Sequence, residues 1–120
     1  MSLIPIEDPD IKKIRKMLFQ LTITPAYKGF DYATYAIWLC VQKPEYLKQA
    51  TTRLYPLVAE HFGTTPMCVD RNIRTIARVA WDYNPELLSK LAGVKLRAKP
   101  RNVRFLSIIY WRLFGAKYIN

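Results

Sequence analysis

The sequence predicts an all-α fold, a compact bundle of about six helices that contains a helix–turn–helix. Three observations lead to this prediction. Apolar residues recur with the 3.6-residue period of helices along most of the chain, and no segment alternates convincingly as a strand would. Thr-Pro and Asn-Pro pairs mark helix starts. Glycine or proline follows several of the periodic segments, as expected where helices end.

The first half of the chain is expected to hold a leader and three helical segments. Residues 1–9 contain two prolines and several polar residues, and we expect them to be an unpacked, flexible leader. Asp10 is expected to cap a first helix that runs to about residue 21. A second helix is expected over about 31–42 and is broken by the proline that follows. A third helical segment is expected over about 45–54.

The string LYPLVAEHFGTTPMCVDRNIRTIARVAW predicts two helices joined by a tight turn. Gly63 ends the first helix, because glycine adopts the left-handed conformation at little cost. Thr65 supplies a hydroxyl N-cap for the second helix, and Pro66 suits its first position. We therefore expect a helix–turn–helix over about residues 55–83, with the second helix at about 66–83.

This second helix combines an apolar stripe with a ridge of arginines. The apolar residues fall at i, i+4, i+7, i+8 and i+11, and they are Val69, Ile73, Ile76, Ala77 and Ala80. Arg71, Arg74 and Arg78 lie about half a turn away, at roughly 100° per residue. Such a helix suits the major groove of DNA. Taken alone, the pattern fits a solvated face on an ordinary amphipathic helix equally well.

The last third of the chain is expected to form a short helix, a basic loop and a final helix. Asn84 and Pro85 start the short helix, which ends at Gly93. Residues 94–101 form the loop, and Asn102 caps the final helix. The residues expected to pack from this helix are Phe105, Ile108, Ile109, Trp111 and Leu113. Since no long linker divides the chain, residues 10–120 are expected to be one domain.

The charge of the chain favours a polyanionic partner. There are 19 Lys and Arg residues against 9 Asp and Glu, a net charge of +10, and no acidic residue follows Glu86. The basic residues of this acid-free part are Lys90, Lys95, Arg97, Lys99, Arg101, Arg104, Arg112 and Lys117. A positive field of this kind attracts nucleic acid, with an anionic membrane surface as the second choice.

Catalytic, metal and membrane functions are not expected. His61 is the only histidine, and Cys40 and Cys68 form no CxxC pair, so four zinc ligands are hard to assemble. We find no Gly-rich phosphate loop, no GxSxG and no paired carboxylates, and we expect neither an enzyme nor a cofactor. The apolar runs are shorter than a membrane span, and no signal peptide is visible. We expect a soluble, intracellular protein with reduced thiols.

The chain resembles the C-terminal effector domain of the master response regulator of sporulation in endospore-forming bacteria. The resemblance rests on the helix–turn–helix string, on ITPAYKGF before it and on RAKPRN after it, and covers about residues 10–114. It implies an all-helical fold of about six helices that binds double-stranded DNA, with head-to-tail self-association on repeated sites. It also implies a cytoplasmic, nucleoid-associated bacterial protein, and a receiver domain ahead of the effector domain. These 120 residues have no room for one, so we expect either a receiver-free protein or a fragment.

The resemblance also assigns roles to residues. It implies that Asp70 and Arg71 read base edges, with Arg74 close by. Alternatively, Asp70 orients a neighbouring arginine, or is simply a first-turn acid that suits the helix dipole. The residues expected on the DNA backbone are Lys28, Thr65, Arg78, Arg97, Lys99, Arg101 and Asn102. Cys68 replaces a basic residue of the family, so the DNA target is not expected to be shared.

Two further hypotheses remain open beside a sequence-specific transcription regulator. The first is a protein-interaction module that has lost site recognition and uses Trp38, Tyr110 and Trp111 as surface aromatics. The second is nonspecific binding of RNA or nucleoid DNA through the acid-free, basic part of the chain after Glu86. On this hypothesis the charge of residues 95–104 alone provides the affinity.

Overall fold

The computed structural model describes residue 5 and residues 7–115. Over these residues the fold consists of helices and the segments that connect them. The α-helices of this described part are α1 (Pro9–Gln20), α2 (Lys28–Gln42), α3 (Tyr55–Phe62), α4 (Pro66–Tyr83), α5 (Pro85–Ala92) and α6 (Asn102–Phe114). Two short turns of other helical types, η1 (Pro44–Lys48) and η2 (Ala50–Leu54), connect α2 to α3. The predicted all-α fold is confirmed over these residues.

The first helix begins two residues earlier than predicted. Asp8, not Asp10, is its N-cap: the Oδ1 atom of Asp8 accepts hydrogen bonds from the backbone N–H of Asp10 at 2.7 Å and of Ile11 at 3.2 Å. Pro9 occupies the first helical position, where no N–H donor is needed. The predicted leader thus loses Pro9 to α1 and Asp8 to its N-cap, and residues 1–4 and 6 lie outside the described residues.

The second helix begins at Lys28 instead of about residue 31. Gly29 precedes the predicted start of this helix, but it lies buried in the first turn of α2 against α4. A Cβ atom on Gly29 would lie 2.4 Å from the backbone oxygen of Asn72 in α4. The glycine therefore allows a close approach of two helix backbones, which a residue-by-residue pattern does not reveal.

The helix expected over about 45–54 is wrong as a single element. Its first part, η1, is a 3₁₀ turn that starts at Pro44, and its second part, η2, is a π turn. The residue between them, Gln49, has φ −127° and ψ 39°, which is outside the helical region. The N–H of Leu54 then donates to the Gln49 oxygen, five residues back, so the chain changes its winding before α3.

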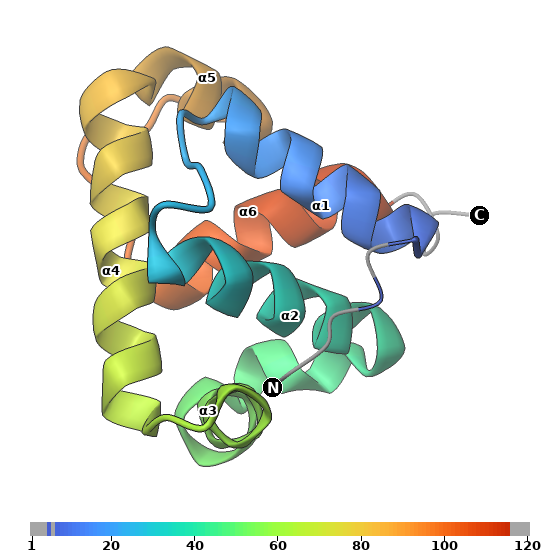
Figure 1. Ribbon diagram of the computed structural model, residues 1–120. Helices are drawn as coiled ribbons and strands as arrows, with labels where there is room; N and C mark the ends of the chain where they lie inside the picture. The colour runs from blue at the N-terminus through green and yellow to red at the C-terminus, as the bar shows by residue number, and fades with distance from the viewer. Residues whose placement is uncertain (1–4, 6, 116–120) are drawn as a thin grey trace.

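The helices of the predicted helix–turn–helix follow one another as expected. Gly63 ends α3 with φ +66°, in the left-handed region. The Thr65 hydroxyl accepts a hydrogen bond from the Cys68 backbone N–H at 3.1 Å and caps α4. In Figure 1, α4 runs along one edge of the molecule, and α3 is seen end-on beside its start.

The core lies between α2 and the helices around it, since α2 packs against α1, α4 and α6 (Figure 1). The predicted apolar stripe of α4 is entirely buried there: Val69, Ile73, Ile76, Ala77 and Ala80. Fixing this stripe on α2, α3, α5 and α6 leaves the opposite face of α4 in solvent. Among the described helices, none is both long enough and apolar enough to span a membrane.

The last helix departs from its prediction at both ends. Arg101, not Asn102, occupies its N-cap, and the Asn102 side chain turns toward α4 instead of capping α6. Near the other end, Trp111 is 52% exposed and contributes less to packing than expected. Tyr110 is fully buried, so it is not one of the surface aromatics that the protein-interaction hypothesis requires.

Candidate nucleic-acid interface

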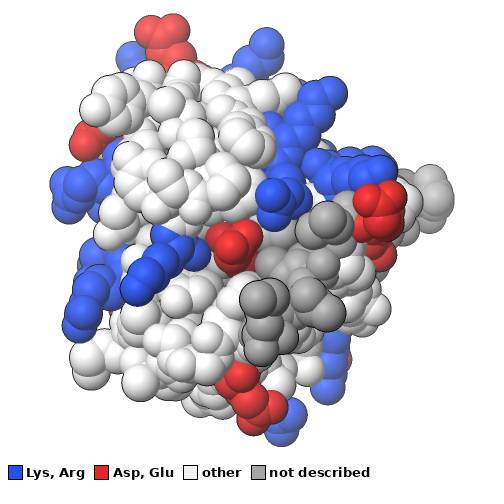
Figure 2. Space-filling view, in the orientation of Figure 1, with Lys and Arg blue, Asp and Glu red and all other residues white. Residues whose placement is uncertain are grey.

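The solvent face of α4 carries the three predicted arginines. Arg71, Arg74 and Arg78 are all exposed, on the side opposite the buried stripe. Figure 2 shows Lys and Arg side chains projecting along the edge that α4 forms, at the left, and a second group over α1. The positive charge of α4 is therefore displayed on a rigidly seated helix.

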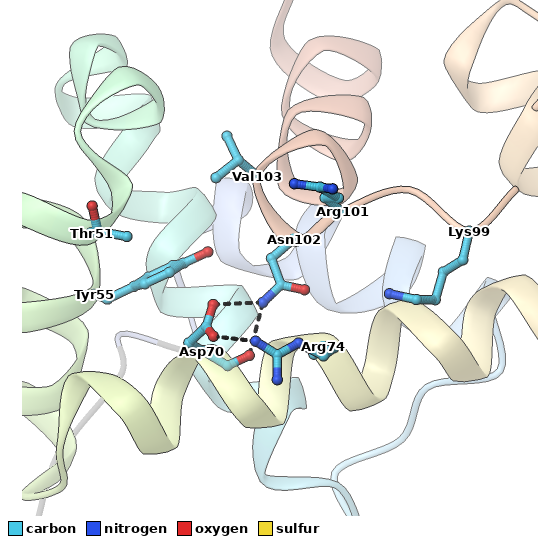
Figure 3. Close-up of a pocket in the computed structure, with 8 residues that line it drawn as sticks. All are labelled: Thr51, Tyr55, Asp70, Arg74, Lys99, Arg101, Asn102 and Val103. Carbon is cyan, nitrogen blue, oxygen red and sulfur yellow. Dashed lines mark hydrogen bonds and ion pairs between the residues drawn. The ribbon is translucent and has the colours of Figure 1, made fainter.

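Asp70 lies between this face and the start of α6. Its Oδ1 atom and its backbone oxygen each accept a hydrogen bond of 2.8 Å from the Nδ2 atom of Asn102. Its Oδ2 atom lies 2.6 Å from the Nη2 atom of Arg74, an i,i+4 ion pair (Figure 3). Both carboxylate oxygens are thus occupied, and one of the predicted roles for Asp70, the orientation of a neighbouring arginine, has direct geometric support.

Asn102 was predicted to contact the DNA backbone, and the structure places it inward. It is 8% exposed, and its amide nitrogen is committed to Asp70 across 32 residues of sequence. The two hydrogen bonds join the first turn of α6 to α4. Asn102 is therefore positioned to hold the basic loop against α4, whatever else it contacts.

The N-terminal end of α4 brings a second set of predicted residues together. The pKa of the Cys68 thiol is lowered, first by a hydrogen bond with Thr64 and further by the charges of Lys28 and Arg71. Lys28, at the first position of α2, therefore lies near Arg71 although 43 residues separate them in the sequence. Thr65 is exposed next to this cluster, with its hydroxyl engaged as the α4 cap.

Lys99 in the basic loop approaches the arginine ridge. Its pKa is lowered, first because burial disfavours the ammonium ion and then because Arg78 and Arg74 repel it. Loop residues 94–101 thus extend the positive face of α4 instead of lying apart from it. Arg97 lies farther along the loop, in a second hollow of about 610 Å³ that it shares with Lys95 and Arg104.

An open cavity of about 450 Å³ lies where η2, α3, α4 and the start of α6 meet (Figure 3). The residues that line it are Thr51, Tyr55, Asp70, Arg74, Lys99, Arg101, Asn102 and Val103. Four of the predicted site residues besides Asp70 thus share one cavity. Thr51 and Tyr55 were not predicted, because nothing in their local sequence indicates that η2 and α3 face the basic loop.

A comparison with known protein families identifies the family of the chain. Residues 14–113 match the family described as "Sporulation initiation factor Spo0A C terminal". The chain belongs to this family. The match spans all of α2, α3, α4 and α5 and most of α1 and α6, so it includes every predicted site residue.

The family membership settles the general class of the protein. The sporulation Spo0A C-terminal family consists of DNA-binding effector domains of transcription regulators, and it is not a family of enzymes. The chain is accordingly a DNA-binding effector-type domain connected with sporulation. The resemblance found from the sequence alone is confirmed.

Proposed function

We propose that the chain is a sequence-specific transcription regulator that places α4 in the major groove of double-stranded DNA. The observation that carries this proposal is the asymmetry of α4: one side is wholly buried, and the other displays three exposed arginines. A helix fixed in this way presents its side chains to base edges without the cost of ordering its backbone on binding.

Within this proposal, Arg71 and Arg74 read bases. Exposed guanidinium groups of this kind suit the O6 and N7 atoms of guanine, which they contact bidentately. The Asp70 carboxylate already accepts hydrogen bonds from Arg74 and Asn102, so we assign it chiefly to orienting Arg74. The residues proposed to contact the backbone are Lys28, Thr65, Arg78, Arg97, Lys99 and Arg101. Head-to-tail pairing on repeated sites remains part of the proposal.

The test is a selection of binding sites from randomised duplex DNA at about 0.15 M salt, followed by titration of the winner against random sequence. Arg71→Ala is expected to cost roughly 1–3 kcal/mol on the selected site and to relax its specificity. Lys99→Ala is expected to weaken binding to all sequences alike and to lower the salt slope by about 1.

Arg112→Ala is the matched control, because it removes an equal charge from an exposed position near the end of α6. It is expected to preserve the preference for the selected site. A selection without a motif, or equal losses on selected and random DNA for Arg71→Ala, would refute base reading by α4. Binding that follows the charge of residues 95–104 alone would favour the nonspecific alternative.

A further inference from the structure

We propose that the cavity between η2, α3, α4 and the start of α6 is a binding site for a phosphate oxyanion. Tyr55 and Thr51 are new members of this site, together with Arg101, Lys99 and the first backbone N–H groups of α6. Where the phosphate belongs to DNA, the inference rests on the proposed function. A free phosphorylated ligand would use the same chemistry.

The Tyr55 hydroxyl is the first observation. Tyr55 is 2% exposed, and its hydroxyl is buried with no hydrogen-bond partner among the described residues. In Figure 3 this hydroxyl points toward Asn102 and Val103 at the start of α6. A buried hydroxyl without a hydrogen-bond partner is unfavourable, and an acceptor in the cavity would remove this cost.

The hydroxyl is available as a donor. Burial raises the pKa of Tyr55 to about 12, and the nearby Asp70 carboxylate adds to the shift. Asn102 lies close enough to oppose the shift in part, but it forms no hydrogen bond with the hydroxyl. Tyr55 therefore keeps its proton throughout the neutral range and can donate it to an anion.

The start of α6 is the second observation. The Arg101 side chain makes no capping hydrogen bond, and the first intrahelical bond runs from the Phe105 N–H to the Arg101 oxygen at 2.8 Å. The N–H groups of the first turn precede this bond and have no acceptor within the helix. Together with the helix dipole, they favour an anion at the edge of the cavity that Asn102 and Val103 line.

The charges around the cavity agree with an anionic ligand. Asp70 is the only carboxylate among the lining residues, and Arg74 and Asn102 already occupy its oxygens. Lys99 and Arg101 form no ion pair with any described carboxylate. The cavity therefore keeps two uncompensated cations, beside a hydroxyl donor and a free helix terminus.

Inorganic phosphate is the probe for the first arm of the test. The amide signals of Val103 and Arg104 are followed by NMR while phosphate replaces chloride at constant ionic strength. We expect saturable shifts, and we expect Tyr55→Phe to weaken phosphate binding by about tenfold, the loss of one charge-assisted hydrogen bond. Tyr83→Phe is the control, because Tyr83 is 70% exposed near the end of α4.

DNA is the probe for the second arm. On a duplex, Tyr55→Phe is expected to weaken selected and random sequences by the same factor and to leave the salt slope unchanged, since no charge is lost. Arg101→Gln is expected to lower the slope of the salt dependence of DNA binding by about 0.9. The control Arg112→Gln is expected to leave this slope unchanged. Tyr55→Phe is also expected to preserve or raise stability, which a purely structural role for the hydroxyl does not predict.

The outcomes separate this inference from the proposed function. Phosphate shifts that a duplex abolishes by competition would support a backbone phosphate as the occupant. Saturable phosphate binding without any selected DNA motif would support a free phosphorylated ligand and refute base reading by α4. Equal phosphate and DNA affinities for Tyr55→Phe and Tyr83→Phe, with Arg71-dependent specificity intact, would overturn the phosphate site and leave the proposed function standing.

Discussion

The contact between Asn102 and Asp70 predicts a measurable energetic coupling between α6 and α4. Asn102→Ala removes two hydrogen bonds of 2.8 Å, one to a backbone oxygen and one to a carboxylate. A neutral hydrogen bond contributes about 1 kcal/mol and one to a charged group about 1.5–3 kcal/mol. Since the Asp70 side chain is 35% exposed, water replaces part of the loss. We therefore expect Asn102→Ala to lower the free energy of unfolding by about 2 kcal/mol.

The assay is a double-mutant cycle with Asp70→Ala, measured by urea unfolding at neutral pH. Asp70→Ala removes the same carboxylate bond and also the ion pair with Arg74, which contributes about 0.5 kcal/mol because both side chains are partly exposed. Each single variant loses the hydrogen bond between Asn102 and the Asp70 carboxylate, whereas the double variant loses this same bond only once. The expected coupling energy is therefore about 1–1.5 kcal/mol.

Asn84→Ala supplies the matched control for this cycle. Asn84 also donates its side-chain amide to another segment, the hydroxyl of Thr22, but it lies at the opposite end of α4 from Asp70. Fourteen residues of helix separate them, about 21 Å. Asn84→Ala and Asp70→Ala should add within about 0.5 kcal/mol. A coupling for Asn102 and Asp70 no larger than that of this control would refute the inference that Asn102 holds α6 to α4.

Three other predictions concern packing, thiol chemistry and pH. Gly29→Ala is expected to lower the free energy of unfolding by about 1–3 kcal/mol, because its Cβ would clash with the Asn72 backbone, which cannot swing aside, and with the Ile76 side chain. A variant as stable as the parent would contradict this. Cys68, whose thiol pKa is lowered, should react with iodoacetamide in the folded protein. Cys40 is buried and its pKa is raised to about 12, so it should react only after unfolding. Mass spectrometry distinguishes the two labelled cysteines, and bound DNA should protect Cys68. Burial lowers the pKa of His61 below its usual 6.5, so the unfolded chain takes up its proton first and stability should fall as pH drops below about 6.5. Urea unfolding of His61→Phe should show a shallower loss in this window, and parallel pH profiles would exclude the effect.

The bounds of α4 were predicted closely because its signals are local. Thr65 and Pro66 define the start, Asn84 and Pro85 follow the end, and the apolar period selects the buried face. The start of α1 was missed because a proline tolerated in the first turn was interpreted as part of a leader. Local signals of this kind predict the presence of a helix more reliably than its exact end, here whether Asp8 or Asp10 is the N-cap.

The candidate site was predictable only in part. Periodicity and charge placed the arginines on the outer face of α4, since both depend on residues within a few turns of each other. The meeting of Asp70 with Asn102, and of Tyr55 with the basic loop, depends on how η2, α3 and α6 pack around α4. Contacts across 32 residues leave no trace in the local pattern, so these partners could not be found before the fold.

The network around Asp70 bears on how the DNA target of this domain can change. Any replacement of Asp70 that cannot accept hydrogen bonds releases Arg74 and removes one of the two hydrogen bonds from Asn102, so it would disturb the proposed base and backbone contacts together. Among the described residues, Cys68 has no such connection to α6, because its partners lie in α4, in the turn before α4 and in α2. A side chain at position 68 can therefore vary with little structural cost, and in this chain a cysteine stands where the resemblance implies a basic residue. Under the proposed function, we therefore expect target preference to diverge most easily at position 68, while position 70 is constrained by its hydrogen bonds to α6.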